Sequence, residues 1–466
     1  MSAEKDLTKG NLWKGILLFS LPLVLSNLLQ VLFNMSDVAV VGKFGSSTSL
    51  GSVGATSTIV VLFTGFLIGM GSGVNALAAQ YFGSKAKKEL GETVHTSAII
   101  CFTVGCFLCV VLFFAAKPVL VLVDTKEEFL GGATLYLKIY AFGLPATALY
   151  NFGNGVLSAA GDTKKPLIFL AIAGVINILL NLFFVIVCHL DVAGVAIASI
   201  SSQYVSAFLI VLSLCRAQGA VKLRAADLKV SPDKAKKVLG LGVPAGCQYA
   251  IFSLANLFIQ KAVNYFSPTF FEGNSAAANA DSLVYDVMAA FYTACSSFMG
   301  QNYGAGKKER MKKCYFVCQT YSFLSGAFIG LFLVVFGRPF LSMFTSSPDV
   351  IDAGMQRLTI MGCTYAFSAF MDCATAASRG LGKSLIPTIL VISGSCVFRI
   401  VWIYTVFAHF HTVLSLYLLY VFSWVITAIA EIVYFAVVYK KTVAKMDAKP
   451  NTNGQHATET QTAESV

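Results

Sequence analysis

The chain has 466 residues, of which 56% are hydrophobic and 12% are charged, whereas a soluble domain carries roughly 25% charged residues. A soluble protein of this composition would expose large apolar patches, so lipid is expected to be the solvent for much of the surface. The formal net charge of +11 does not indicate a nucleic-acid partner, because the basic residues are spread over short loops and form no contiguous basic face.

Long apolar segments recur along the chain. About 20 apolar residues span a bilayer as an α-helix, whereas a β-barrel would show short alternating segments, which the sequence lacks. The first apolar run, Gly15 to Val41, is longer than a signal-peptide core and has no obvious small-residue cleavage site. The sequence therefore predicts an all-α polytopic membrane protein with twelve transmembrane helices, at residues 14–41, 52–82, 94–116, 133–158, 167–188, 192–215, 238–266, 276–303, 315–336, 354–378, 385–407 and 413–439.

The predicted helices divide into two groups of six. The longest polar connection, residues 216–237, separates the sixth helix from the seventh. The end of the chain is polar and lacks any apolar run, so we expect it to be disordered. The predicted regions are a cytoplasmic N-terminus (1–13), an N-lobe (14–215), a cytoplasmic linker (216–237), a C-lobe (238–439) and a disordered cytoplasmic tail (440–466).

The distribution of basic residues predicts the topology. The chain ends and loops on the side of the N-terminus hold 26 Lys and Arg residues, against six on the opposite side. Because cytoplasmic loops are enriched in Lys and Arg, we expect a multi-pass plasma-membrane protein with both termini in the cytoplasm. The six residues assigned to the opposite loops are Lys43, Lys117, Lys126, Lys138, Arg338 and Arg357.

The sequence repeats itself at an offset of 221 or 222 residues. Six helices return the chain to its starting side, so the two halves run in the same direction. Parallel six-helix repeats related by an axis along the membrane normal are a transporter architecture, with the substrate site between the halves. Three separated matches define the repeat: residues 20–22 with 242–244, 79–83 with 300–304, and 161–166 with 382–387.

The first helix carries the strongest functional signal. Asn27, Gln30, Asn34 and Asp37 are spaced three, four and three residues apart, so they lie within about 80° of the helix circumference. A carboxylate at bilayer depth costs at least ~2.5 kcal/mol by insertion scales, so Asp37 is expected to face the protein interior or water. Burial favours its protonated form, which makes it a candidate proton carrier. The alternative is an interfacial Asp37 that only makes hydrogen bonds.

Two further helices hold polar residues suited to join Asp37. Asn177 and Asn181 lie four residues apart on one face of the fifth helix, and their carboxamides can bind a cation or position a protonated Asp37. Ser199 in the sixth helix is a weaker candidate, because serine commonly bonds its own helix backbone. The predicted cation-coupling site is Asp37, Asn34, Asn177, Asn181 and Ser199. The alternative for the asparagine pair is hydrogen bonding between neighbouring helices.

Ionisable residues also lie inside the apolar segments of the second half. Unpaired charges in lipid are expensive, so Lys261 is expected to pair with an acid that the sequence does not identify. Arg399 and Glu431 are expected to form structural pairs or to extend toward the interface. The residues in question are Lys261, Asp281, Asp286, Asp372, Arg399 and Glu431.

The substrate cavity is expected to contain aromatic and small residues together with a few acids. Aromatic faces and carboxylates together favour hydrophobic cations. We therefore predict that Gln30, Asp281 and Asp372 contact a small amphipathic substrate of this kind.

The sequence contains no signature of ATP hydrolysis or of intramembrane hydrolysis. It lacks a GxxxxGK[ST] loop and the HExxH and GxSxG motifs. Of its twelve cysteines, Cys106 and Cys109 have CxxC spacing but lie inside an apolar run, and no His/Cys cluster has metal-ligand spacing. The glycines of residues 69–73 lie inside an apolar helix and indicate close helix packing. We expect no enzymatic activity, no metal site and no cofactor beyond a coupling ion, H⁺ or Na⁺.

Several motifs together resemble the multidrug and toxic compound extrusion (MATE) transporters. The run from Phe19 to Gly42 is similar to the first helix of that family. Residues 79–83 and 300–304 resemble the paired endings of its second and eighth helices, and residues 160–163 and 379–384 its loops after helices four and ten. The similarity extends over most of the chain.

The resemblance implies two six-helix lobes in a V shape, and export of amphipathic, often cationic compounds in exchange for H⁺ or Na⁺. It places the family's first-helix acid at Asp37, its fifth-helix Asn-xxx-Asp motif at Asn177 and Asn181, and its sixth-helix hydroxyl at Ser199. Asn181 stands where many members have Asp, so one charge is absent and H⁺ is favoured over Na⁺. The seventh helix also lacks the acid that some members carry, which argues against a C-lobe Na⁺ site.

Three functions compete. The leading one is a cation-coupled antiporter for drugs or metabolites, which we expect to act as a monomer in the lipid bilayer without a nucleic-acid partner. The second is a lipid-linked oligosaccharide flippase of a related fold, which would favour a strongly basic cavity for a diphosphate; only Lys261 and Arg399 are predicted as buried cations. The third is an intramembrane enzyme, which the missing catalytic motifs disfavour.

Overall fold

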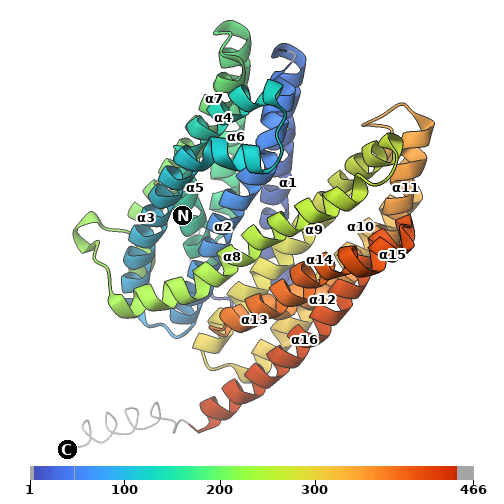
Figure 1. Cartoon of the computed structure of the whole chain (residues 1–466). Helices are drawn as coiled ribbons and strands as arrows, with labels where there is room; N and C mark the ends of the chain where they lie inside the picture. The colour runs from blue at the N-terminus through green and yellow to red at the C-terminus, as the bar shows by residue number, and fades with distance from the viewer. Residues whose placement is uncertain (1–4, 47, 449–466) are drawn as a thin grey trace, which may run out of the picture.

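The computed structural model describes residues 5–46 and 48–448, and every regular element in these ranges is helical (Figure 1). The first half contains α1 (Leu12–Phe44), α2 (Ser49–Gly83), α3 (Lys87–Leu122), α4 (Glu127–Ala141), α5 (Leu144–Ala159), α6 (Lys164–Leu182), the π-helical turn η1 (Phe183–Val187) and α7 (Asp191–Cys215). The connection to the second half contains the 3₁₀ turns η2 (Gly219–Val221) and η3 (Ala225–Asp227).

The second half repeats the plan of the first with more interrupted helices after α12. It contains α8 (Pro232–Val263), α9 (Pro268–Gly304), α10 (Lys308–Leu341), α11 (Pro348–Gly362), α12 (Tyr365–Gly380), α13 (Leu385–Val391), η4 (Ile392–Val397), α14 (Phe398–Trp402), η5 (Ile403–Phe407), α15 (Ala408–Phe410) and α16 (Val413–Asp447).

The predicted all-α fold with two related lobes is confirmed. Within the described ranges, nine helical segments are long and apolar enough to cross a membrane. The other three predicted spans correspond to α9, which has 37 residues but is not among these nine, and to the pairs α4–α5 and α11–α12. Each pair is interrupted by a two-residue break, and the two breaks occupy equivalent positions in the repeat.

Local sequence explains the break between α4 and α5. The Gly143 N–H donates to the Tyr140 carbonyl oxygen at 2.9 Å, which closes α4 in a tight turn. Pro145 then lies in the first turn of α5, where its missing N–H is not needed. The equivalent break in the second half has no proline, and there the Thr364 N–H donates to the Met361 carbonyl oxygen at 2.9 Å. The repeat therefore preserves the backbone shape even where it does not preserve the proline.

Several helices extend beyond their apolar runs. α8 begins at Pro232, inside the predicted linker of residues 216–237, and α16 continues to Asp447, inside the predicted disordered tail of residues 440–466. The tail prediction is therefore wrong for residues 440–447, because Lys, Ala and Met favour helix and the Lys308 ammonium contacts Asp447. Residues 449–466 lie outside the described residues, and the remaining domain boundaries stay predictions.

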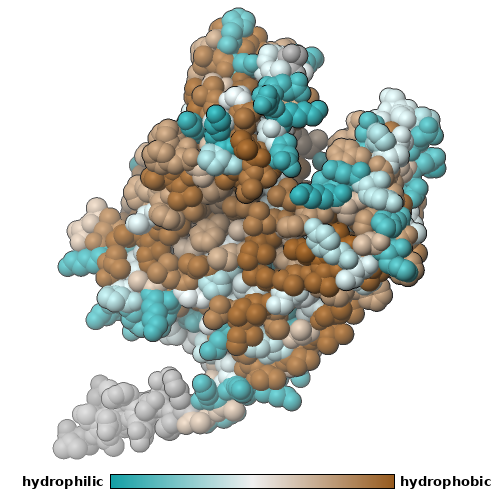
Figure 2. All heavy atoms as spheres, viewed as in Figure 1, coloured by the Kyte–Doolittle hydropathy of each residue, from teal (hydrophilic) through white to brown (hydrophobic). Residues whose placement is uncertain are grey.

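The two lobes diverge at one end and meet at the other. Figure 1 shows α1–α7 and α9–α16 separating toward the end of α1 and the start of α9, so the ribbon has the outline of a V. Figure 2 shows apolar side chains over much of the middle of both lobes, whereas hydrophilic residues gather toward their ends. This distribution fits a protein whose lobes both contact lipid.

Close helix packing joins the lobes where α2 crosses α8. A Cβ atom added at Gly69 would lie 2.4 Å from the Gly246 backbone nitrogen, and one added at Gly73 would lie 2.4 Å from that of Gly242. Each helix thus presents two glycines four residues apart to the other, an arrangement that lets membrane helices approach closely. The packing role predicted for the glycines of residues 69–73 is confirmed.

Two equivalent hydrogen bonds connect the lobes at the end where they meet. Gln80 Nε2 of α2 donates to the Gly380 carbonyl oxygen at 2.8 Å, and Gln301 Nε2 of α9 donates to the Ala159 carbonyl oxygen at 2.7 Å. Each glutamine therefore binds the end of a helix in the opposite lobe, and the two contacts are 221 residues apart in sequence. We call this end of the molecule the closed end.

The start of the chain adds a third connection at the closed end. The Lys5 N–H donates to the Ala160 carbonyl oxygen at 3.1 Å, in the N-lobe. The Leu7 N–H donates to Gln301 Oε1 at 2.9 Å, and the Lys307 ammonium donates to the Thr8 carbonyl oxygen at 2.7 Å, both in the C-lobe. The segment before α1 thus bridges the two lobes.

We predict that Gly73→Ala destabilises the protein by about 1–3 kcal/mol, because the added methyl group overpacks the α2–α8 crossing. The apparent melting temperature of the purified protein in detergent should fall. The matched control is Gly54→Ala on the same helix, whose Cβ would meet no atom within 4 Å and should be neutral or mildly stabilising. Equal melting temperatures for the two variants would contradict the packing described for α2 and α8.

Candidate functional site

The Asp37 carboxylate near the end of α1 accepts hydrogen bonds from two other helices of the N-lobe. Asn181 Nδ2 of α6 donates to its Oδ1 atom, and Ser199 Oγ of α7 donates to its Oδ2 atom at 3.0 Å. Asn181 Nδ2 also donates to Asn177 Oδ1 at 3.2 Å. The structure therefore brings together four of the five residues predicted for the cation-coupling site.

Local sequence places α1 against α6 at this point. Asn177 and Asn181 are one turn apart, so both carboxamides leave α6 on the same face. Gly174 precedes them on that helix, and a Cβ atom there would lie 1.8 Å from Cζ of the Phe33 ring. The glycine therefore makes room for Phe33 of α1, one turn before Asp37, and the close approach of the two helices brings the carboxylate to the carboxamides.

The partners of Asp37 are buried, Asp37 itself is partly buried, and one oxygen atom of the cluster lacks a hydrogen-bond partner within the described part of the chain. The Asn177 and Asn181 side chains are 4% and 0% exposed. Asn181 Oδ1 has no hydrogen-bond partner within the described part of the chain. No described Lys or Arg forms an ion pair with Asp37, so its charge is stabilised there by hydrogen bonds from uncharged groups.

These contacts allow the cluster to bind the carboxyl group in two protonation states. Both partners donate to the carboxylate, which matches its ionised form. A protonated carboxyl needs an acceptor, and rotation of the Asn181 carboxamide would present Oδ1 in place of Nδ2. The same side chain can therefore donate to the ionised state and accept from the protonated one.

The polar face of α1 contacts both lobes. Asn27 Nδ2 donates to the Asp286 carbonyl oxygen of α9 at 2.8 Å, whereas Asp37, farther along the same face, contacts α6 and α7. Gln30 and Asn34 lie between these points with exposed side chains. No hydrogen bond joins Asn34 to Asp37 in the described part of the chain, and the Asn34 side chain is exposed, so its place in the cation-coupling site stays a prediction.

In the C-lobe, Asp281 of α9 is held by α11 and α12. The Arg357 guanidinium of α11 forms an ion pair with Oδ2, and the Tyr365 hydroxyl of α12 donates to Oδ1. Arg357 is 5% exposed and also donates to Asn274 Oδ1 at 2.5 Å. The charge of Asp281 is therefore matched inside the lobe, and its contact with substrate stays a prediction.

Two assignments of basic residues are corrected here. Arg357 was assigned to an outer loop, but it is buried in α11, because the break before α12 brings α11 beside α9. Lys261 was expected to pair with a buried acid, but it lies exposed near the end of α8, without an ion pair to any described residue. The cation that neutralises Asp281 is therefore Arg357.

Asp372 of α12 has no ion-pair partner within 4 Å among the described residues, although it is only 9% exposed. Its Oδ2 atom has no hydrogen-bond partner in the same part of the chain. Arg379, two turns later on α12, donates instead to Gln248 Oε1 at 3.0 Å and, across the lobes, to Ser72 Oγ at 3.2 Å. A buried carboxyl oxygen without a partner is available to a cation.

Arg399 of α14 is enclosed by other C-lobe residues. Its Nε atom donates to Ser423 Oγ at 3.0 Å, and its guanidinium lies 4.5 Å from the centre of the Tyr420 ring and 6.0 Å from that of Trp424. The structural role expected for Arg399 fits these contacts. Glu431 of α16 is fully buried, with no ion pair to a described residue.

Sequence reasoning missed two arginines that shape the C-lobe interior. Arg357 and Arg379 had been assigned to loops by their position near the ends of apolar runs, yet both are buried. The small residues Ala374, Thr375 and Ala376 before Arg379 are a signal for a tightly packed helix, which would have favoured burial.

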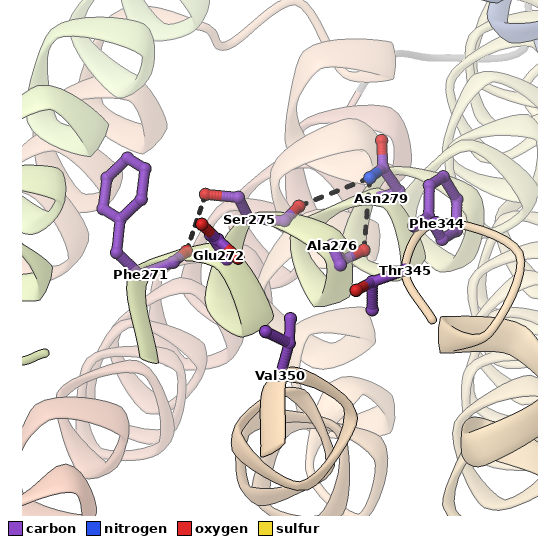
Figure 3. A pocket seen from close by; sticks show the side chains of 8 residues that line it. All are labelled: Phe271, Glu272, Ser275, Ala276, Asn279, Phe344, Thr345 and Val350. Atoms are coloured by element: carbon purple, nitrogen blue, oxygen red, sulfur yellow. Dashed lines mark hydrogen bonds between the residues drawn. The ribbon is translucent and has the colours of Figure 1, made fainter. Parts of the chain in front are cut away.

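A separate shallow hollow of about 420 Å³ lies where α9 begins and where α10 connects to α11. Figure 3 shows that the polar groups drawn there are largely satisfied by their own helix, since Asn279 Nδ2 donates to the carbonyl oxygens of Ser275 and Ala276 at 3.3 and 3.1 Å. The hollow contains none of the predicted site residues. It is therefore not a candidate for the central site.

Two related helical lobes that diverge from a closed end, with a partly buried carboxylate between helices of one lobe, are the architecture of a two-lobed membrane transporter. The MatE family model matches residues 22–183 and again residues 244–405, once in each lobe. The chain therefore belongs to the MatE family, in agreement with the resemblance of its motifs.

Similar proteins include both named transporters and solved structures. The chain is 29% identical over 394 residues to the probable multidrug resistance protein YpnP of Bacillus subtilis, covering 84% of this chain and 88% of that protein. It is 22% identical to the FAD transporter of Shewanella oneidensis, with 78% and 81% coverage. A MOP superfamily transporter from Pyrococcus furiosus shares the fold, with a TM-score of 0.88 at 20% identity over 95% of this chain and 99% of that one.

We predict that Arg357→Met destabilises the protein by about 3–5 kcal/mol, because it leaves the Asp281 carboxylate unpaired in the C-lobe. The double variant Arg357→Met with Asp281→Asn should recover much of the lost melting temperature. Arg338→Met is the matched control, since the Arg338–Asp352 pair is more than half exposed on both sides and such pairs contribute about 0–1 kcal/mol. A double variant as unstable as Arg357→Met alone would contradict the pairing.

Proposed function

We propose that the protein is a cation-coupled antiporter that exports small amphipathic organic compounds by alternating access, and that H⁺ bound at Asp37 is the coupling ion. The observation that carries the proposal is the partly buried Asp37 carboxylate, which is held by amide and hydroxyl donors and by no described cation. A carboxylate in such a site is expensive to keep charged and is therefore sensitive to protonation.

The coupling rests on different hydrogen bonds in the two states of Asp37. The ionised form accepts from Asn181 and Ser199, whereas the protonated form donates to Asn181 Oδ1 after its carboxamide turns. An ion shifts a conformational equilibrium only as far as its contacts differ between the two conformations. Because α1 also contacts Asp286 of the C-lobe through Asn27, a small movement of α1 at Asp37 is passed to the contact between the lobes.

H⁺ is preferred over Na⁺ as the coupling ion because the cluster contains a single carboxylate. Asn177 and Asn181 supply neutral oxygens, and among the described residues no group of three His, Cys, Asp or Glu side chains is arranged to hold a metal ion. A Na⁺ site built from neutral oxygens and one carboxylate is weaker than one with two carboxylates. A proton, by contrast, needs only one carboxylate to bind.

The closed end is proposed to face the cytoplasm, with both chain termini on that side. The basic connections before α3 and α10 lie at this end, as does the segment before α1, and cytoplasmic loops are enriched in Lys and Arg. The lobes then diverge toward the outside, so the structure represents an outward-open state of the transport cycle.

The substrate is proposed to be a hydrophobic cation. The buried arginines are engaged, Arg357 by Asp281 and Arg399 by Ser423 and aromatic rings. The carboxyl groups of Asp286 and Asp372 form no ion pair with a described residue. They are therefore available to pair with a cationic ligand. The relative named as a probable multidrug resistance protein supports export of drug-like compounds in general, and an oligosaccharide flippase is not favoured.

We predict that Asp37→Asn abolishes proton-driven transport, because it removes the titratable group and keeps its shape. Proteoliposomes with an acidic interior should accumulate ethidium through the unmodified protein and at least about tenfold more slowly through the variant. Asp349→Asn is the matched control, since Asp349 is exposed in the first turn of α11. If Asp37→Asn transports at the normal rate, Asp37 is structural and the coupling proposal is wrong.

We predict that Asn181→Asp strengthens the response to Na⁺, because a second carboxylate beside Asp37 adds the charge that a cation site lacks. The measurement is ethidium uptake into proteoliposomes preloaded with Na⁺ at equal pH on both sides. The size-matched control is Asn181→Leu, which adds no charge. An equal Na⁺ response for the unmodified protein and Asn181→Asp would contradict this reading of the cluster.

The substrate class has its own test. We predict that the purified protein binds and transports ethidium-like cations in preference to aromatic anions of similar size, and that Asp372→Asn weakens the binding of cations. Fluorescence anisotropy of the bound dye measures the affinity directly. Transport of anions with no response to cations would overturn the substrate assignment while leaving the Asp37 experiment unaffected.

A further inference from the structure

We propose that a groove on the lipid-facing side of the C-lobe, between α10 and α16, is a binding site for an anionic phospholipid. The cavity has a volume of about 610 Å³ and is closed on a third side by Phe370 of α12. It lies outside the central cleft and shares no residue with the Asp37 cluster. The site is therefore separate from the proposed transport pathway.

The groove opens toward lipid rather than toward the space between the lobes. Phe316 and Leu324, which line it from α10, are 54% and 55% exposed. Tyr315 and Phe435, which form its inner wall, are buried, and their tilted rings lie with centres 4.5 Å apart. An apolar chain entering from the membrane would therefore meet an aromatic wall that is already in place.

One end of the groove is basic. Lys312 of α10 and Lys440 of α16 both line it at the closed end of the molecule, where the first turns of α10 and the last turns of α16 lie. Neither ammonium group forms an ion pair with a described residue. Two unpaired cations beside an apolar groove are complementary to the phosphate of an anionic lipid headgroup, and basic pockets between membrane helices bind such headgroups.

A buried glutamine supplies an independent sign of a ligand. Gln319 lines the groove and is 7% exposed, yet both its Nε2 and Oε1 atoms have no hydrogen-bond partner in the described part of the chain. In a membrane no water is available to satisfy such a group. The glycerol ester region of a lipid presents acceptors and, in many headgroups, hydroxyl donors at the corresponding depth.

The spacing along α10 matches the parts of a phospholipid in order. Gln319 follows Lys312 by seven residues, or about 10 Å of helix, and Leu324 follows it by twelve residues, or about 18 Å. The phosphate would lie between the lysines, the ester groups would approach Gln319, and an acyl chain would extend along the aromatic wall toward Leu324 and Ile432. A soluble phosphate would satisfy only the first of these three contacts.

The test compares lipid binding to the full-length protein, purified in detergent and stripped of lipid. Native mass spectrometry and melting temperature are recorded with added phosphatidylglycerol, phosphatidylcholine or inorganic phosphate. We expect retained phosphatidylglycerol adducts and a rise in melting temperature with that lipid only. Equal effects of phosphatidylcholine would overturn the anionic headgroup, and equal stabilisation by inorganic phosphate would overturn the lipid. These comparisons require no variant.

Paired variants locate the site. Lys312→Gln with Lys440→Gln should weaken phosphatidylglycerol binding by about tenfold or more, because each lysine contributes about one kcal/mol to binding an anionic surface. Lys313→Gln with Lys441→Gln is the matched control, since these exposed neighbours do not line the groove. Gln319→Leu should weaken lipid binding without lowering the melting temperature of the lipid-free protein. Equal loss in the two lysine pairs would show that only general surface charge is involved and would overturn the site.

Discussion

The structure depends on backbone contact between the lobes at the closed end. Gln80 and Gln301 each bind the carbonyl end of a helix in the opposite lobe, and a Cβ atom at Gly83 or Gly304 would lie 1.9 Å from the carbonyl oxygen of Gln301 or Gln80. No side chain separates the two backbones there, so a larger residue at either glycine would push the lobes apart. Because the contact occurs twice, once from each half of the repeat, it constrains both lobes equally. The separation of the lobes at the other end follows from it.

The two lobes use this shared frame for different chemistry. In the N-lobe, the Asp37 carboxylate has uncharged hydrogen-bond partners. The C-lobe interior holds several ionisable groups, of which Asp281 and Arg357 neutralise each other. Without water to stabilise a charge, the Asp281–Arg357 pair is a fixed part of the C-lobe core, whereas Asp37 is the carboxyl group that we propose changes its protonation state. α1 connects this group to the other lobe, since its polar face contacts α6 and α7 at one level and α9 at another. The duplicated fold is thus symmetric in shape and asymmetric in charge.

The sequence predicted the features that depend on short segments of chain. Apolar runs located the membrane helices, the 221-residue offset predicted two similar lobes, and three- and four-residue spacings placed Asp37 and Asn181 on faces that do meet. Features that depend on contacts between helices far apart in the sequence could not be predicted from it. The partner of Asp281 is Arg357 rather than Lys261, because the break between α11 and α12 determines how α11 packs on α9. The extension of α16 to Asp447 likewise depends on its packing against α10, which polarity alone does not reveal.

The central claim is that the protonation state of Asp37 sets how far the lobes open. The most direct measurement is the distance between spin labels at Lys126→Cys and Ser346→Cys, in the α3–α4 and α10–α11 connections, in a background without the exposed native cysteines. Double electron–electron resonance spectroscopy measures this distance in lipid nanodiscs as the pH is lowered. In the protein with Asp37 intact, the distribution of distances between the two labels should shift. The account predicts a distribution independent of pH when Asp37→Asn is added. The same pH-dependent shift in both proteins would contradict it.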